Sequence, residues 1–236
     1  MPRRTGIEVA FVLAATAIGC GAPATPAAGP QMARTGGAGE ESDGVSAEGL
    51  LGDISAEDVQ RVIENNEEAL AACYGKALEV EESIEGALRI RMEVSPSGRA
   101  ESAFIEKSDL GSLEAEECIL ARVESFSYPR SRGGNARVSY PLVLTSPYTP
   151  PRPEVWPSSR LDAVAAGHDA EVRQCLAGAT GVEITLWVGP GGRALSAGAA
   201  AFGLEAYEGA ACVARAAMNW TYPDPGASPA KATLSF

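Results

Sequence analysis

The chain has 236 residues, of which 45% are hydrophobic and 21% are charged, a composition typical of a globular protein. Nineteen Lys and Arg against 31 Asp and Glu give a formal net charge of −12. Because so acidic a chain repels phosphate groups, we expect neither nucleic acid nor an anionic membrane surface among its partners.

Residues 1–19 are typical of an export signal peptide. Two arginines precede an apolar run that is too short to cross a bilayer, which needs about 20 apolar residues. Residues 17–20, Ala-Ile-Gly-Cys, resemble a bacterial lipobox, in which the cysteine is acylated and becomes the mature N-terminus. The resemblance predicts a lipid anchor at Cys20, and the alternative is an ordinary secretory signal. Gly21 is not the aspartate that commonly retains lipoproteins at the inner membrane, which favours the outer membrane, facing the periplasm.

Two segments are predicted to be connectors rather than folded units. Residues 20–51 are rich in Gly, Ala and Pro and show no sustained apolar period, so we expect a lipidated, flexible tether. Residues 146–157, SPYTPPRPEVWP, are rich in proline and predict a stiff, extended linker. Two units remain, at 52–145 and 158–236.

The two units repeat each other. SPSGRA (95–100) matches GPGGRA (189–194), and FSYPRS (126–131) matches WTYPDP (220–225), both at an offset of 94 residues. Cys118 falls on Cys212 at the same offset. Cys73 falls on Cys175 at an offset of 102, so the first unit has eight extra residues near EVEESIEG. We interpret the units as tandem copies.

The pattern within the first unit predicts the order α-β-β-α-β. Ser55 begins a helix that we expect to run to about Leu78, and ALRIRMEV (87–94) alternates as a half-buried strand does. The SPSG turn leads into a second strand, and Ser112 begins a second helix that ends near Ser125. A last strand follows from Ala136 to Leu144. The second unit has the same order with an alanine-rich strand and helix, and we expect it to be degenerate, with a looser core.

Several of these residues resemble a known family. The motifs are CY at 73–74, G-x-L-x-I-x-M-x-V from Gly86, the SPSG turn, Cys118, and the closing F-x-Y-P and Y-P-L. They are similar to the C-terminal domain of the AgmX/PglI type, which is found in envelope proteins of gliding bacteria. That domain in turn resembles the TonB C-terminal domain. The resemblance covers nearly all of 55–145 and, more weakly, 158–236. It implies an α+β fold of two tandem TonB-C-like units, each a three-stranded sheet with two helices on one face.

Export favours disulfide formation, and four of the five cysteines lie in the repeated units. Four cysteines allow three connectivities. Pairing within each unit predicts Cys73–Cys118 and Cys175–Cys212, which leaves Cys20 for the lipid.

The sequence offers little catalytic chemistry. The single histidine, His168, has no second histidine to join it in a metal site or a triad, and we interpret it as a hydrogen-bonded residue at the edge of the core. The cysteines lack C-x-x-C spacing, which argues against zinc. Acidic runs, among them EAEE at 114–117, are interpreted as solvated faces. We therefore expect no enzyme activity, no metal and no cofactor.

Two classes of function remain. The first is a non-catalytic, lipid-anchored binding or scaffolding module of the cell envelope. A gliding or transport assembly is the kind of machine to which such a module could belong. The second is a TonB-like energy transducer that contacts outer-membrane receptors and would need a persistent membrane helix.

The predicted partner-binding segment is the last strand of the first unit. Pro141 has no backbone N–H, so this strand belongs at a sheet edge, where a partner strand can be added. The residues assigned to this edge are Arg137, Val138, Ser139, Tyr140 and Pro141. The alternative is that Pro141 only protects the edge and no partner exists.

Overall fold

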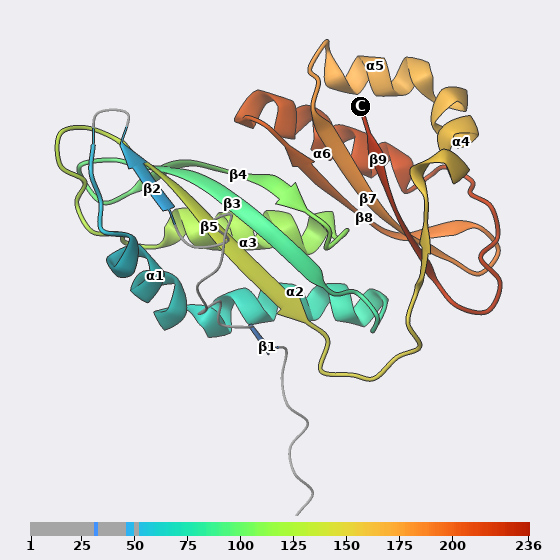
Figure 1. Ribbon diagram of the computed structural model, residues 1–236, viewed down its shortest axis with the longest axis horizontal. Coiled ribbons are helices and arrows are strands. Elements are labelled where there is room, and N and C mark those ends of the chain that lie inside the picture. The colour runs from blue at the N-terminus through green and yellow to red at the C-terminus, as the bar shows by residue number, and fades with distance from the viewer. Residues whose placement is uncertain (1–30, 33–45, 50–51) are drawn as a thin grey trace, which may run out of the picture.

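The computed structural model describes residues 31–32, 46–49 and 52–236 (Figure 1). These residues form an α+β fold, as the sequence predicted, and they contain six α-helices and two sheets. Figure 1 shows the two sheets side by side, each with its own helices. We call residues 52–145 the first half and residues 154–236 the second half.

The first half begins with two helices, α1 (Ala56–Asn65) and α2 (Glu67–Val80), where the sequence predicted one. Ser55 caps α1 as expected, because its Oγ accepts a hydrogen bond of 3.2 Å from the Asp58 amide. The helix breaks at Asn66, whose φ of −115° and ψ of 18° are not helical. The Asn66 side-chain amide donates to the carbonyl of Val62 (2.8 Å), and this competition with the backbone explains the break.

The first sheet has β3 (Gly86–Val94) at its centre, between β4 (Ala100–Ser108) and β5 (Ala136–Thr145). Alternate residues of β3 point into the core, as the sequence pattern predicted, and its arginines lie on the other face. The β3–β4 turn needs glycine at Gly98, where φ is +80°. Helix α3 (Leu113–Ser125), capped by Ser112, packs beside α2 against the core.

Two short strands extend this sheet. The strands β1 (Gln31–Met32) and β2 (Ser46–Gly49) both pair antiparallel with β5. The prediction of a wholly flexible tether over 20–51 is therefore wrong at these residues. Pairing uses the backbone N–H and C=O groups that every residue except proline carries, so the Gly- and Ala-rich composition held no signal for it.

The second half opens on β6 (Glu154–Trp156), which pairs in parallel with β9 (Ala230–Ser235). The predicted linker 146–157 is thus partly a strand, and its Trp156 is buried. The second sheet has the order β6-β9-β7-β8, with β7 at Val182–Gly189 and β8 at Arg193–Ala201. Its helices are the short η1 (Ser158–Arg160), α4 (Asp162–Gly167), α5 (Asp169–Leu176) and α6 (Leu204–Ala217).

Several contacts recur in the two halves at the offset of 94 residues. The Tyr128 hydroxyl donates to the Val123 carbonyl (2.9 Å), and the Tyr222 hydroxyl donates to the Ala217 carbonyl (2.8 Å). The amides of these tyrosines donate to Gly98 and Gly192, both at 2.9 Å. The aromatic-Pro elements seen in the sequence therefore have the same structural role in both halves. Each connects the end of a helix to the hairpin turn through hydrogen bonds of its tyrosine.

The halves share one hydrophobic core rather than two separate ones. Side chains of β7 are buried on both faces of its sheet. Ile184 and Leu186 lie on one face, and Thr185 and Trp187 lie on the other, where they meet the first half. Most alanines of β8 are buried, and their small side chains allow the first half to pack closely against this strand.

Candidate functional site

The predicted binding strand, β5, is the outer strand of the first three-stranded unit. Val138, Ser139 and Tyr140 are buried, Arg137 is exposed and Pro141 is half-buried. Backbone donors alternate in direction along a strand. Pro141 has no amide hydrogen, so we infer that its nitrogen faces away from β3. Ser139 and Arg137, two and four residues earlier, then point their amides to that same side.

The outward edge of β5 is occupied by the chain itself. Ser46 pairs with Ser139 and Glu48 with Arg137, so β2 covers residues 136–139, while β1 pairs with residues 144–145. The expectation of an open edge at Arg137 and Ser139 is therefore corrected. The strand that pairs with this edge belongs to the same chain, so binding of a partner's strand stays a prediction.

Both predicted disulfides are present and each lies within one half. Cys73 of α2 is bonded to Cys118 of α3, and Cys175 of α5 is bonded to Cys212 of α6, with Cα atoms 5.6 and 5.5 Å apart. In each half the bond ties together the two helices that cover the sheet. Cys20, the predicted lipid site, lies outside the described residues.

The β4–α3 segment of the first half docks on the open face of the second sheet. Thr185 donates to the carbonyl of Ser108 (3.2 Å), and the Trp187 indole donates to the carbonyl of Leu110 (2.7 Å). Lys231 of β9 lies beside them, 3.1 Å from the carbonyl of Glu85 and 3.7 Å from the Asp109 carboxylate. Burial lowers the pKa of Lys231, and the two acidic side chains oppose this effect.

We call the contact between the β4–α3 segment and the second sheet the junction. Glu116 of α3 is its most unusual residue. The sequence analysis placed it on a solvated face, and this was wrong, because its side chain is fully buried. It accepts hydrogen bonds from the Ser108 hydroxyl (2.7 Å) and the Ala199 amide (2.8 Å). Burial raises the pKa of Glu116 to about 7, and these hydrogen bonds act in the opposite direction.

The junction also requires the absence of a side chain at Gly198. A Cβ atom there would lie 2.5 Å from the Glu116 carboxylate and 2.7 Å from the Cα of Gly111. A second ion pair, between Glu117 and Arg215, closes the junction at the surface. The signal that could have revealed this interface is the run of small residues in β8, which the sequence analysis interpreted as a loose core.

The sequence analysis interpreted His168 as a hydrogen-bonded residue at the edge of the core; in the structure this side chain is half-buried, and its neighbours are an aromatic ring and a carboxylate. Its ring stacks on Trp220, with centroids 4.5 Å apart and an interplanar angle of 10°. Glu171 accepts a hydrogen bond from the Trp220 indole (2.9 Å) and lies 3.4 Å from Nδ1 of His168. Within the described ranges, no three His, Cys, Asp or Glu side chains are grouped as metal ligands.

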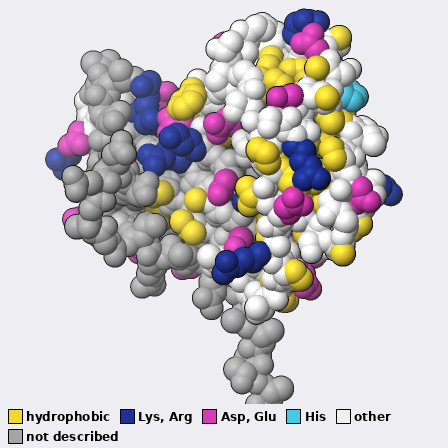
Figure 2. Space-filling model, turned by 45° about the vertical axis from the view of Figure 1, so that its right-hand side comes forward, with side chains coloured by type: hydrophobic (Ala, Val, Ile, Leu, Met, Phe, Trp, Pro, Cys, Tyr) yellow, Lys and Arg dark blue, Asp and Glu magenta, His cyan; other side chains and the backbone are white. Residues whose placement is uncertain are grey.

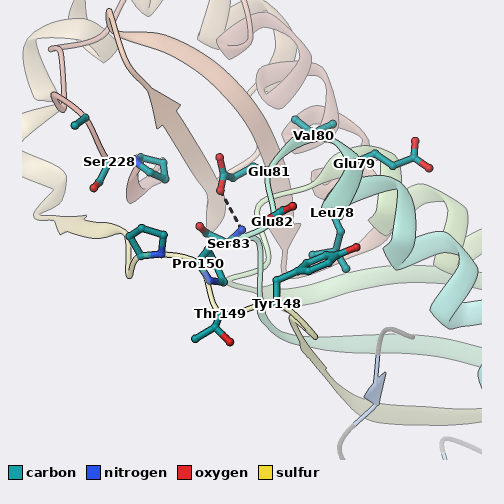
Figure 3. A pocket seen from close by; sticks show the side chains of 13 residues that line it. Leu78, Glu79, Val80, Glu81, Glu82, Ser83, Tyr148, Thr149, Pro150 and Ser228 are labelled. Carbon is teal, nitrogen blue, oxygen red and sulfur yellow. Dashed lines mark hydrogen bonds between the residues drawn. The ribbon is translucent and has the colours of Figure 1, made fainter. Parts of the chain in front are cut away.

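Two open grooves border the first half, and one of them is shared with the second half. One of about 820 Å³ is bordered by the end of α2, the linker and the loop before β9 (Figure 3). Its rim is acidic, with Glu79, Glu81 and Glu82, and Glu81 accepts a hydrogen bond of 3.0 Å from the Ser83 amide. The other groove, of about 550 Å³, lies between the α1–α2 break and the end of α3.

Among the described side chains on the face drawn in Figure 2, acidic and basic groups are interspersed with hydrophobic ones, and no large area carries a single charge. Comparison of the chain with models of protein families, with curated proteins and with solved structures finds no match.

Among the residues that the structure describes, none of the helices has the length and apolarity needed to span a bilayer.

Proposed function

We propose that this protein is a non-catalytic, lipid-anchored component of the cell envelope that binds other envelope proteins as a scaffolding module. The observation that carries the proposal is the pairing of β2 with β5 at residues 136–139. This edge takes up a strand through backbone hydrogen bonds, and strand addition is a common mode of protein recognition. A partner strand would take the place of β2.

The disulfides support the part of the proposal that concerns export. Disulfides form and persist in oxidising compartments such as the periplasm. Four cysteines joined into two intramolecular bonds, with Cys73 buried, are in keeping with a protein that folds after translocation. The export signal and Cys20 then supply the route to the membrane.

The proposal includes two tandem copies of one TonB-C-like unit. Its support is the recurrence at fixed offsets of the disulfides, the tyrosine hydrogen bonds and the glycine turns. A chance likeness of Pro/Gly-rich turns does not account for contacts that repeat in three different elements.

Lipid attachment is tested by labelling cells with palmitate and isolating the full chain. Label is expected on the wild type and absent from Cys20→Ser. An unlabelled wild type that keeps residues 1–19 would contradict the anchor and favour the alternative, a TonB-like transducer with a persistent membrane helix.

Partner binding is tested by placing a photo-crosslinking residue at Arg137, on the β5 edge, and at the exposed Glu114 of α3 as the matched control. Crosslinks to a second envelope protein are expected at position 137 and not at 114. Crosslinks from 137 only to residues 46–49 of the same chain would mean that β2 is a permanent cover and the edge binds no partner.

A further inference from the structure

The groove of about 550 Å³ in the first half corresponds to a place that is filled in the second half. Asn66 and His168 each separate two helical segments, with nearly the same φ and ψ (−115° and 18°, −114° and 15°). Phe126 and Trp220 each precede by two residues the tyrosine that bonds the end of the helix. The two pairs are therefore equivalent positions in the two halves.

In the second half, three side chains of the chain itself occupy this place. The His168 ring stacks on Trp220, and the Glu171 carboxylate accepts a hydrogen bond from the indole. A flat ring over an aromatic face, with a carboxylate at its edge, is a favourable arrangement of dispersion and electrostatic contacts.

In the first half, the equivalent residues leave the same place open. Asn66 stands for His168, and its amide is turned back to the carbonyl of Val62. Ala69 stands for Glu171, since both lie three residues after the break. Phe126 is only partly buried, and together with Val62 it forms the apolar side of the groove.

The charge of the groove is also reversed. Arg122 lines it, whereas the equivalent residue of the second half, 94 positions later, is Ala216. Arg122 is exposed, and it forms no ion pair with another described residue. At the equivalent positions, the second half thus has the Glu171 carboxylate and Ala216, and the first half has Ala69 and the Arg122 guanidinium.

We propose that the groove between Asn66 and Phe126 binds a partner protein segment that carries an aromatic ring beside a carboxylate. The ring stacks on Phe126 where the imidazole of His168 lies in the second half, and the carboxylate pairs with Arg122. This site is separate from the β5 edge, so its failure in the test below would leave the strand-addition proposal standing.

The probes are N-acetyl-phenylalanine, which has a ring and a carboxylate, and N-acetyl-phenylalaninamide, which has the ring alone. Each is titrated into the ¹⁵N-labelled full chain while amide chemical shifts are followed. For ligands of this size we expect saturable binding with a Kd on the order of millimolar. Shifts should centre on Asn66, Ala69 and Phe126, with the acid binding about fivefold more tightly than the amide, because the ion pair is exposed.

Two variants separate the contributions of ring and charge. Arg122→Gln should abolish the preference for the acid and leave binding of the amide unchanged. The triple change Asn66→His, Ala69→Glu and Phe126→Trp copies the second half, fills the groove and should abolish binding of both probes. The reverse change, His168→Asn with Glu171→Ala, should open a second groove that shows no preference for the acid, because Ala216 replaces the arginine.

The proposal is overturned if neither probe gives saturable shifts, if acid and amide bind equally well, or if Arg122→Gln keeps the preference. Unchanged binding in the folded triple variant would also overturn it. If the triple variant does not fold, the comparison of acid and amide in the wild type and in Arg122→Gln still decides the question.

Discussion

The carboxylate of Glu116 on α3 accepts a hydrogen bond of 2.8 Å from the backbone amide of Ala199, in the edge strand β8 of the other half. One side chain of the first half therefore caps the open edge of the second sheet. It also places a titratable group inside the junction, next to Ser108, Ser112, Glu117 and Tyr207.

The junction should weaken as the pH rises through the range in which Glu116 loses its proton. Burial raises its pKa from 4.5 to about 7, so between these values the folded state holds a proton that the unfolded state has lost. The contribution is fully present below pH 4.5 and is lost as the pH approaches 7, by about 3 kcal/mol at most. Glu116→Gln should remove this slope in urea unfolding at pH 5 and pH 8, whereas Glu114→Gln, at an exposed site, should retain it. Parallel pH profiles for the wild type and Glu116→Gln would contradict the prediction.

Removal of either disulfide should destabilise the protein. The bonds close loops with sequence separations of 45 and 37 residues. In the chain-entropy model each loss costs about 4 kcal/mol. Cys73→Ser with Cys118→Ser, and Cys175→Ser with Cys212→Ser, are compared by urea unfolding. Peptide mapping of the non-reduced wild type is the direct check, and a peptide linking Cys73 to Cys175 or Cys212 would refute the pairing.

Gly198→Ala should loosen the junction. The added methyl group would meet the Glu116 carboxylate and the Gly111 backbone at less than a contact distance, and overpacking of this kind costs about 1–3 kcal/mol. The matched control is Gly75→Ala in α2, where no atom beyond the adjacent residues and the helix's own backbone lies within 4 Å of the new Cβ. That variant should gain up to about 1 kcal/mol from helix propensity. Equal free energies of unfolding for the two variants would show that β8 does not need glycine here.

The β2–β5 pairing should be visible in amide hydrogen exchange. Glu48→Pro removes a donor from β2 opposite Arg137, so the amides of Arg137 and Ser139 should exchange about tenfold faster or more. Val138 and Tyr140 serve as internal controls, because their amides point to β3 and should stay protected. Exchange that is unchanged at all four residues would mean that β2 gives β5 no protection in solution.

What the sequence by itself determined is local. Helix caps at Ser55 and Ser112, the alternation of β3 and the glycine turn at Gly98 each depend on neighbours a few residues away, so their patterns can be read directly from the chain. The disulfide pairs followed from the repeat, because equivalent cysteines occupy equivalent helices. The choice of β5 as the outer strand came from Pro141, which has no amide hydrogen.

What only the tertiary structure decided is which surfaces meet. Strand β2 pairs through its backbone, which has no compositional signature, and the break at Asn66 depends on one side chain competing for a carbonyl. Glu116 is the same residue type as its solvated neighbours in EAEE, and nothing local distinguishes it. Its burial follows from the docking of α3 on β8, where Gly198 leaves room for a carboxylate. Glu116 and Gly198 lie 82 positions apart in the sequence. A pattern of near neighbours therefore cannot encode their contact.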